Sequence, residues 1–224
     1  MIRNNKGTLI LSSILIILPI LIGLILWNSL PDQMVIHWGV DGQADGWSSK
    51  PFAVFALPLI LLAIHWFCIF LTAKDPKNAD QSSKMIGVIF WISPILSLLV
   101  NSMSYATALG VAFDALTLLY FFLGLMFTVI GNYLPKCKQS YTIGIKISWT
   151  LNSEANWLAT HRFAGRIWTL CGILLMGVAL LPAPIALVSS LVILTVMAVV
   201  PIVYSYRFYQ KESEAERNHD PRSR

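Results

Sequence analysis

The chain has 224 residues, of which 56% are hydrophobic and only 12% are charged. A soluble domain cannot bury this much apolar surface, and a mean hydropathy of +0.68 is typical of a membrane protein. The net charge of +5 does not call for a nucleic-acid partner, because anionic lipid headgroups account for it.

Six apolar runs follow one another along the chain, and each predicts a transmembrane helix. A bilayer core of about 30 Å needs roughly 20 residues of helix, and the two shorter runs are extended by flanking aromatic residues. The runs are Leu9–Trp27, Phe52–Thr72, Met85–Tyr105, Leu116–Ile130, Ile167–Leu181 and Ile185–Tyr204. No small-residue cleavage site follows the first run, so we expect it to be retained as a membrane helix.

Basic residues predict the orientation. All but one of the 16 Lys and Arg residues lie before the first run, in the segments 73–84 and 131–166, or after residue 204. Only Lys50 lies on the other side, so the positive-inside rule places both termini in the cytoplasm. The expected fold is an all-α polytopic membrane protein with six transmembrane helices, N-in and C-in, with one long extracellular loop and one long cytoplasmic loop.

Three units are predicted. An N-terminal two-span unit (1–72) contains the extracellular loop 28–51, and a four-span unit (85–204) contains the cytoplasmic loop 131–166. The tail 205–224 mixes both charge signs and is expected to be a solvated or disordered cytoplasmic end. Read differently, the chain forms two three-helix halves of inverted topology, a known transporter layout, although the halves show no wider identity.

The extracellular loop combines a strand-like apolar run, Met34–Ile36, with Asp-Gly turn dipeptides at 41–42 and 45–46. Its aromatic side chains, Trp38 and Trp47, are expected to gather over the membrane surface. His37, Asp41 and Asp45 are metal-binding residue types. Their spacing is not diagnostic, so we expect aromatic packing rather than a metal site.

In the cytoplasmic loop, Ser153 is placed to cap a helix whose first turn carries Glu154 and which continues into the fifth span. One stripe of this helix holds Glu154, Trp157, His161, Gly165 and Trp168, and Arg162 and Arg166 lie on the adjoining face. An interfacial helix with Trp at headgroup depth fits this pattern. So does a functional element in which Lys146 folds back beside a partly buried Glu154, and Trp149 beside Trp157.

No catalytic motif is visible, and no cofactor is expected. Two helical turns, about 10 Å, separate Glu154 from His161, which is too far for a compact acid–base pair. Ionisable residues in the spans are scarce, with His65 and Asp114 the clearest. One histidine of this kind is more often a hydrogen-bonded interior residue than part of a proton pathway.

The stretch TIGIKISWTLNSEANWLATHRFAGRIW, residues 142–168, resembles the cytoplasmic signature of the SdpI family, the immunity proteins for the sporulation-delaying toxin. The matching residues are Gly144, Ile145, Trp149, Thr150, Leu151, Trp157, Thr160, His161, Arg162 and Gly165. Lys146 replaces the family's usual Arg, which keeps the charge but loses bidentate hydrogen bonding. The extracellular loop resembles the small domain of unknown function often found before this signature, through Pro31, Ile36, His37, Trp38, Gly42, Asp45, Gly46, Trp47 and Lys50.

This resemblance implies a multi-pass protein of the bacterial plasma membrane that protects its cell from a membrane-active peptide toxin outside. The family's best-known member also signals, by holding a winged-helix repressor at the membrane. The expected function is therefore non-enzymatic toxin resistance, with the lipid bilayer, a peptide toxin and a cytoplasmic repressor as partners. Two alternatives stay open: a small transporter with inverted halves, and a membrane enzyme that uses Glu154 and His161.

Overall fold

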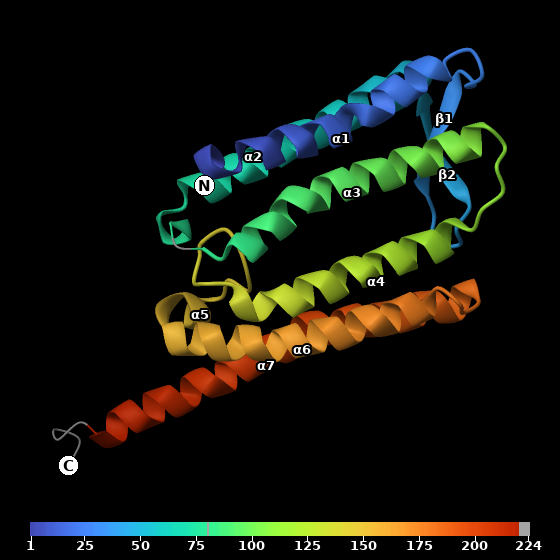
Figure 1. Cartoon of the computed structure of the whole chain (residues 1–224). Helices are drawn as coiled ribbons and strands as arrows, with labels where there is room; N and C mark the ends of the chain where they lie inside the picture. The colour runs from blue at the N-terminus through green and yellow to red at the C-terminus, as the bar shows by residue number, and fades with distance from the viewer. Residues whose placement is uncertain (80, 220–224) are drawn as a thin grey trace.

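The structure is a computed structural model that describes residues 1–79 and 81–219. Long helices run roughly side by side, and a small β-hairpin lies across one end of them (Figure 1). The helices are α1 (Lys6–Ile25), α2 (Leu57–Lys74), α3 (Ser83–Ala108), α4 (Ala115–Tyr133), α5 (Ser148–Asn152), α6 (Glu154–Val178) and α7 (Ala183–His219). The strands are β1 (Gln33–Trp38) and β2 (Ala44–Ser49), and a π-helical turn, Phe52–Ala56, precedes α2.

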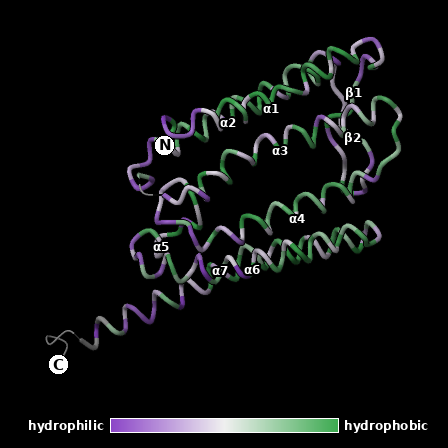
Figure 2. The backbone as a smooth tube through the Cα atoms, viewed as in Figure 1, coloured by the Kyte–Doolittle hydropathy of each residue, from purple (hydrophilic) through white to green (hydrophobic). Residues whose placement is uncertain are grey.

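Each predicted apolar run lies on a long helix, and most ends shift by only a few residues, but α6 begins well before its run and α7 continues well beyond its run. Five helical segments of the described chain are long and apolar enough to cross a membrane: Ile2–Ile25, Phe52–Lys74, Ser83–Ala108, Ala115–Lys136 and Ala183–Ala215. The remaining run is the second half of α6, whose first half carries Glu154, Arg162 and Arg166 and is therefore too polar. Hydrophobic residues fill the middle of the helices and polar residues collect at their ends (Figure 2).

The helices form two groups. Helices α1, α2 and α3 pack against one another, α6 packs against both α4 and α7, and α3 touches α4 only slightly. An apolar cavity of about 520 Å³ lies between α3 and α4, lined by residues such as Leu98, Leu118 and Phe122. We call the end that carries β1 and β2 the hairpin end. The opposite end, which holds residues 75–79, 81–82 and 134–161, is the signature end (Figure 1).

Four glycines allow the backbones of α4 and α6 to approach closely. A Cβ atom on Gly172 would lie 2.6 Å from the Gly124 carbonyl oxygen, and one on Gly165 would lie 2.7 Å from that of Gly131. Small residues at such a crossing let membrane helices pack through their backbones. This glycine seam positions α6, and with it the signature segment, against α4.

Polar side chains join the first three helices. Ser97 Oγ donates to the Ile16 carbonyl at 2.8 Å, and Tyr105 Oη donates to the Pro19 carbonyl, also at 2.8 Å. His65 is buried within 3.0 Å of Ser12 Oγ, so the prediction of a hydrogen-bonded interior histidine is confirmed. These hydrogen bonds join α3 to α1, and α2 to α1.

Two details differ from the sequence expectations. The loop 28–51, which was expected to be extracellular, contains a β-hairpin, so the otherwise helical chain carries a small sheet. Of the two expectations for the tail, solvated or disordered, disorder is wrong up to His219, because α7 continues without a break and extends past the bundle at the signature end (Figure 1). Tail residues 220–224 lie outside the described part of the chain.

Candidate functional site

The β-hairpin is held against helices from both groups. β1 pairs antiparallel with β2, and its Met34 and Val35 are buried. Ser104 Oγ on α3 donates to the Val35 carbonyl at 2.6 Å. At the other end of the hairpin, Gly42 turns the chain with a φ of +78° and lies directly over Leu116 of α4. The hairpin therefore bridges the cleft between α3 and α4.

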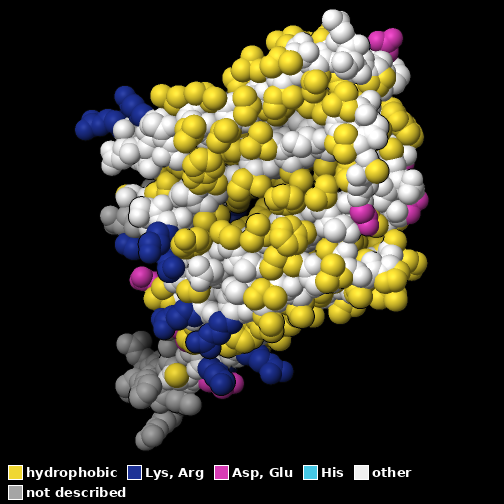
Figure 3. Space-filling model, turned by 45° about the vertical axis from the view of Figure 1, so that its right-hand side comes forward, with side chains coloured by type: hydrophobic (Ala, Val, Ile, Leu, Met, Phe, Trp, Pro, Cys, Tyr) yellow, Lys and Arg dark blue, Asp and Glu magenta, His cyan; other side chains and the backbone are white. Residues whose placement is uncertain are grey.

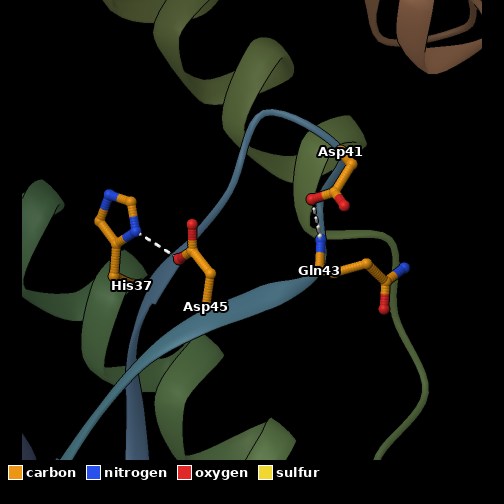
Figure 4. A network of polar contacts seen from close by, with 4 residues as sticks. All are labelled: His37, Asp41, Gln43 and Asp45. Carbon is orange, nitrogen blue, oxygen red and sulfur yellow. Dashed lines mark hydrogen bonds and ion pairs between the residues drawn. The ribbon is translucent and has the colours of Figure 1, made fainter.

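The exposed side of the hairpin carries the residues considered as metal ligands. His37 Nδ1 and Asp45 Oδ1 pair at 2.5 Å and both side chains are exposed (Figure 4). Asp41 turns away from this pair and accepts the Gln43 N–H at 3.0 Å. Trp38 is half-buried, whereas the Trp47 side chain is 56% exposed. The predicted gathering of both indoles over the surface is therefore only partly realised.

Lys50, the one cation of this loop, has a structural position. Its Nζ donates to the carbonyls of Leu30 and Trp27 at 2.7 and 3.2 Å and lies 5.3 Å from the centre of the Trp27 ring. A cation suits the carbonyl-rich C-terminal end of a helix, here that of α1. Asp32 pairs with Lys50 at 3.5 Å, and the exposed Pro31 lies between Asp32 and Leu30. Lys50 thus fastens the chain where it leaves α1.

At the signature end, two aromatic rings of α6 form a buried stack. The Trp157 and His161 rings are 4.0 Å apart at an angle of 20°, and neither is exposed. Trp157 Nε1 donates to the Cys137 carbonyl at 2.8 Å. His161 Nδ1 lies 2.8 Å from the Trp157 carbonyl, while Nε2 accepts the Ile145 N–H at 2.9 Å. This pattern requires the neutral imidazole with its proton on Nδ1.

The segment before α6 is wrapped over this stack. Gly144 has a φ of +103°, and a Cβ atom there would lie 2.5 Å from His161 Nε2, so both conformation and space call for glycine. Thr150 Oγ1 donates to the Ile145 carbonyl at 2.7 Å and accepts the Ile147 N–H. Leu151 packs at the edge of the cluster around Trp157, and its carbonyl accepts a hydrogen bond from Gln139. These signature residues therefore hold one another in place.

Asp75, which the sequence reading did not select, ties the α2–α3 connection to the signature end. Its Oδ2 accepts hydrogen bonds from Ser140 Oγ, the Tyr141 N–H, and the N–H and Oγ1 of Thr142, all within 3.0 Å. Burial tends to raise the pKa of Asp75, but these hydrogen bonds and one from the Lys77 N–H outweigh it and lower the pKa below its usual range. The only sequence signal is an Asp-Pro pair that ends an apolar run.

A second missed network joins α6 to α7. Asn156 Nδ2 donates to the Ser205 carbonyl at 3.0 Å, and Asn156 Oδ1 accepts from Ser205 Oγ and Thr160 Oγ1. All three side chains are buried. Nearby, Ser153 Oγ accepts the Asn156 N–H, as predicted for the helix cap, and donates to Glu212. Thr160, one of the signature residues, is thus part of the contact between helices.

The predicted fold-back of Lys146 and Trp149 is wrong. Lys146 Nζ donates to the Thr142 carbonyl at 3.2 Å and makes no ion pair with Glu154 in the described part of the chain. Trp149 packs on Tyr206 and Tyr209 of α7, with ring centres 5.0 and 6.2 Å away, rather than on Trp157. Glu154 is exposed, so its expected partial burial is also wrong.

The predicted stripe on α6 divides into buried and exposed parts. Trp157, His161 and Gly165 are buried and Trp168 is half-buried, whereas Glu154 is exposed. Arg162 and Arg166 are exposed on the adjoining face, as expected. The signature therefore contains a buried set that shapes the loop, and a few charged side chains that the fold leaves in contact with solvent or lipid.

A bundle of long apolar helices with polar loop clusters at its ends defines a multi-pass helical membrane protein. Residues 14–62 match the family model of a domain of unknown function (DUF1648), and residues 136–205 match that of the SdpI/YfhL protein family. The chain is 24% identical over 206 residues to the protein named "Immunity protein SdpI" from Bacillus subtilis (strain 168). The aligned region covers 90% of this chain and 96% of that protein. No solved structure matches the chain. The chain belongs to the SdpI family and carries DUF1648 near its N-terminus.

Proposed function

We propose that the protein is an immunity protein of the bacterial cell membrane that protects its cell from a membrane-active peptide. The observation that carries the proposal is the similarity to the relative named "Immunity protein SdpI", because it extends over nearly the full length of both chains. It includes the hairpin as well as the signature segment.

The proposed orientation has six spans, with the apolar half of α6 as the fifth and the signature end in the cytoplasm. On the face drawn in Figure 3, Lys and Arg side chains gather at the signature end, with a few acidic side chains among them, whereas acidic side chains are the charged groups seen at the opposite end. At the hairpin end, Lys50 is the one cation of the described loops and is already bound to backbone carbonyls and Asp32. This asymmetry supports an extracellular hairpin.

The hairpin end suits a cationic amphipathic peptide. It carries four carboxylates, those of Asp32, Asp41, Asp45 and Asp114, against the single Lys50 amine. Hydrogen bonds from the Thr117 N–H and hydroxyl group, partly opposed by burial, hold the pKa of Asp114 below its usual range and keep it ionised at neutral pH. Beside these charges, Trp47 and Val40 are exposed. Acidic groups next to apolar ones complement a helix with one basic and one apolar face.

We propose no catalytic step. His161 is buried with both ring nitrogens engaged, and Glu154 is exposed. Burial also raises the pKa of the Cys137 thiol to about 12, which keeps it protonated and unreactive. Signalling through a cytoplasmic winged-helix repressor is part of the proposal. It is supported by the family resemblance, by exposed Lys146 and by the extension of α7 beyond the bundle.

A protection assay tests the function. Cells sensitive to a cationic amphipathic peptide are expected to survive when they express the protein, and to lose protection with the Trp47→Ala and Asp45→Asn double substitution. The variant Gln33→Ala, also exposed on the hairpin, serves as the control at matched protein levels. Full survival with the double variant would exclude the hairpin as the contact surface.

Topology is tested separately by reporter fusions. A reporter inserted within residues 41–45 is expected to be active only outside the cell, and one fused after Arg224 only in the cytoplasm. Opposite results would overturn the orientation and place the signature segment outside.

A further inference from the structure

A pocket at the signature end lies between α6 and α7 and takes no part in the contacts described above. Its volume is about 520 Å³, and its walls include Arg162, Phe163 and Arg166 from α6, and Tyr204 and Phe208 from α7. The rings of Phe163 and Tyr204 stack 4.3 Å apart at 12°, so they form one apolar wall. The pocket thus combines two guanidinium groups with an aromatic surface.

Among the described residues, no carboxylate pairs with either of these two arginines. Arg162 and Arg166 are exposed, and within the described residues neither makes a hydrogen bond or an ion pair. They are one helical turn apart on the same face, where like charges repel each other. Two guanidinium groups in this arrangement can both donate to a single phosphate, which would remove the repulsion. A phosphate diester therefore supplies the negative charge that the two arginines lack.

The position of the pocket favours a lipid as the source of that phosphate. Arg166 directly precedes Ile167, where the apolar half of α6 begins, so both arginines lie at the level of the headgroups. An acyl chain can follow α6 and α7 into the membrane, whereas free phosphate would leave the aromatic wall uncovered. Exposed Arg207 and Lys211 of α7 add to the positive potential near the pocket.

We propose that the pocket formed by Arg162, Arg166, Phe163, Tyr204 and Phe208 binds the phosphate group of an anionic phospholipid. The site is independent of the proposed immunity function and of which end faces the cytoplasm. It also gives a ligand to Arg162, a signature residue for which the described residues supply no hydrogen bond or ion pair.

The experiment compares lipid retention by the full-length protein. The protein is reconstituted in nanodiscs of phosphatidylcholine with one fifth phosphatidylglycerol, released into mild detergent, and its bound lipids are identified by native mass spectrometry. The parent is expected to retain phosphatidylglycerol in preference to phosphatidylcholine. The double variant Arg162→Gln/Arg166→Gln should reduce that preference by about tenfold or more, because each Lys or Arg near anionic lipid contributes to the binding free energy and the variant removes two of them.

Two further variants keep the result interpretable. Lys136→Gln/Lys138→Gln removes the same amount of charge from exposed side chains at the same end, and is expected to retain lipid like the parent. Arg162→Lys/Arg166→Lys keeps the charge but not the bidentate geometry, and should give an intermediate preference even if the Gln variant fails to fold. Equal losses in the control and the Arg→Gln variant would overturn the proposal, as would a Lys variant that binds like the parent.

A competition arm separates lipid from free phosphate. Inorganic phosphate at millimolar concentration is expected to leave phosphatidylglycerol bound to the parent. Displacement of the lipid by inorganic phosphate would assign the site to the free anion and overturn the lipid proposal.

Discussion

Protonation of His161 is expected to open the signature end at mildly acidic pH. Burial lowers the pKa of His161 from its ordinary value of 6.5 to about 4, although the hydrogen bond to the Trp157 carbonyl opposes this effect. The neutral ring accepts the Ile145 N–H at Nε2, and a protonated ring has no lone pair to do so. The stabilisation is complete above pH 6.5 and is lost as the pH falls toward 4, because in that window only the opened chain binds the proton.

The size of the effect follows from the two pKa values. A folded pKa of about 4 against 6.5 in the opened chain corresponds to about 3 kcal/mol in full. About 2 kcal/mol of this is lost between pH 7.5 and pH 5, which makes opening of the segment 144–147 about 30-fold more frequent. Asp75 does not contribute in this window, since its pKa is lowered below its ordinary value of 3.8.

Hydrogen exchange of the protein in nanodiscs measures this opening. The protection of the peptide that contains Ile145 is divided by the intrinsic exchange rate at each pH, and the parent is compared with His161→Gln. Protection in the parent should fall by about 30-fold between pH 7.5 and pH 5. Protection in the variant should be lower at pH 7.5 and nearly independent of pH. Unchanged protection in the parent, or an equal fall in the variant, would refute the reasoning.

Three further substitutions test separate parts of the structure. Gly172→Leu places a Cβ atom 2.5 Å from the Thr128 backbone nitrogen, so it should lower the free energy of unfolding by about 1–3 kcal/mol in detergent titrations. Gly177→Leu on the same helix is the control, because a Cβ atom there has nothing within 4 Å, and it should have little effect. Asp75→Ala removes the acceptor shared by Ser140, Tyr141 and Thr142 and leaves the Tyr141 N–H without its acceptor, so proteolysis within 138–147 should become faster, at a cost of about 2–3 kcal/mol. Lys138→Ala is the control, and equal rates would contradict the role of Asp75. Lys50→Met removes the cation from the end of α1 and should cost about 1–2 kcal/mol, seen as faster proteolysis of the hairpin than in Gln33→Ala.

Hydropathy and local helix signals allowed most of the fold to be predicted. The apolar runs mark the long helices because burial in lipid requires length and low charge, and Ser153 marks the start of α6 because its side chain fills a cap position. β1 was foreseen only as an apolar run at Met34–Ile36. The sequence of β2, Ala-Asp-Gly-Trp-Ser-Ser, has low strand propensity, and this strand exists because it pairs with β1.

Contacts between distant segments could not be predicted in the same way. Asp75 lies 65 residues from Ser140 in the chain, so neither residue signals the other. The glycines of α4 and α6 repeat after two helical turns in both helices, which is visible in the sequence, but the pairing of these two helices is not. Opposite charge suggested that Lys146 would meet Glu154, whereas Lys146 donates to the nearby Thr142 carbonyl, a contact that the charges do not signal.

The slight contact between α3 and α4 has a mechanical consequence. The two helix groups are joined firmly at their ends, by Gly42 of the hairpin over Leu116 and by Asp75 on the segment 140–142, while only the apolar cavity lies between them along much of their length. We expect such an arrangement to resist separation of the two groups at their ends more strongly than a small rotation of one group against the other. A displacement of the hairpin would then be passed along the helices to the joint at the opposite end, which holds Gly144 and His161.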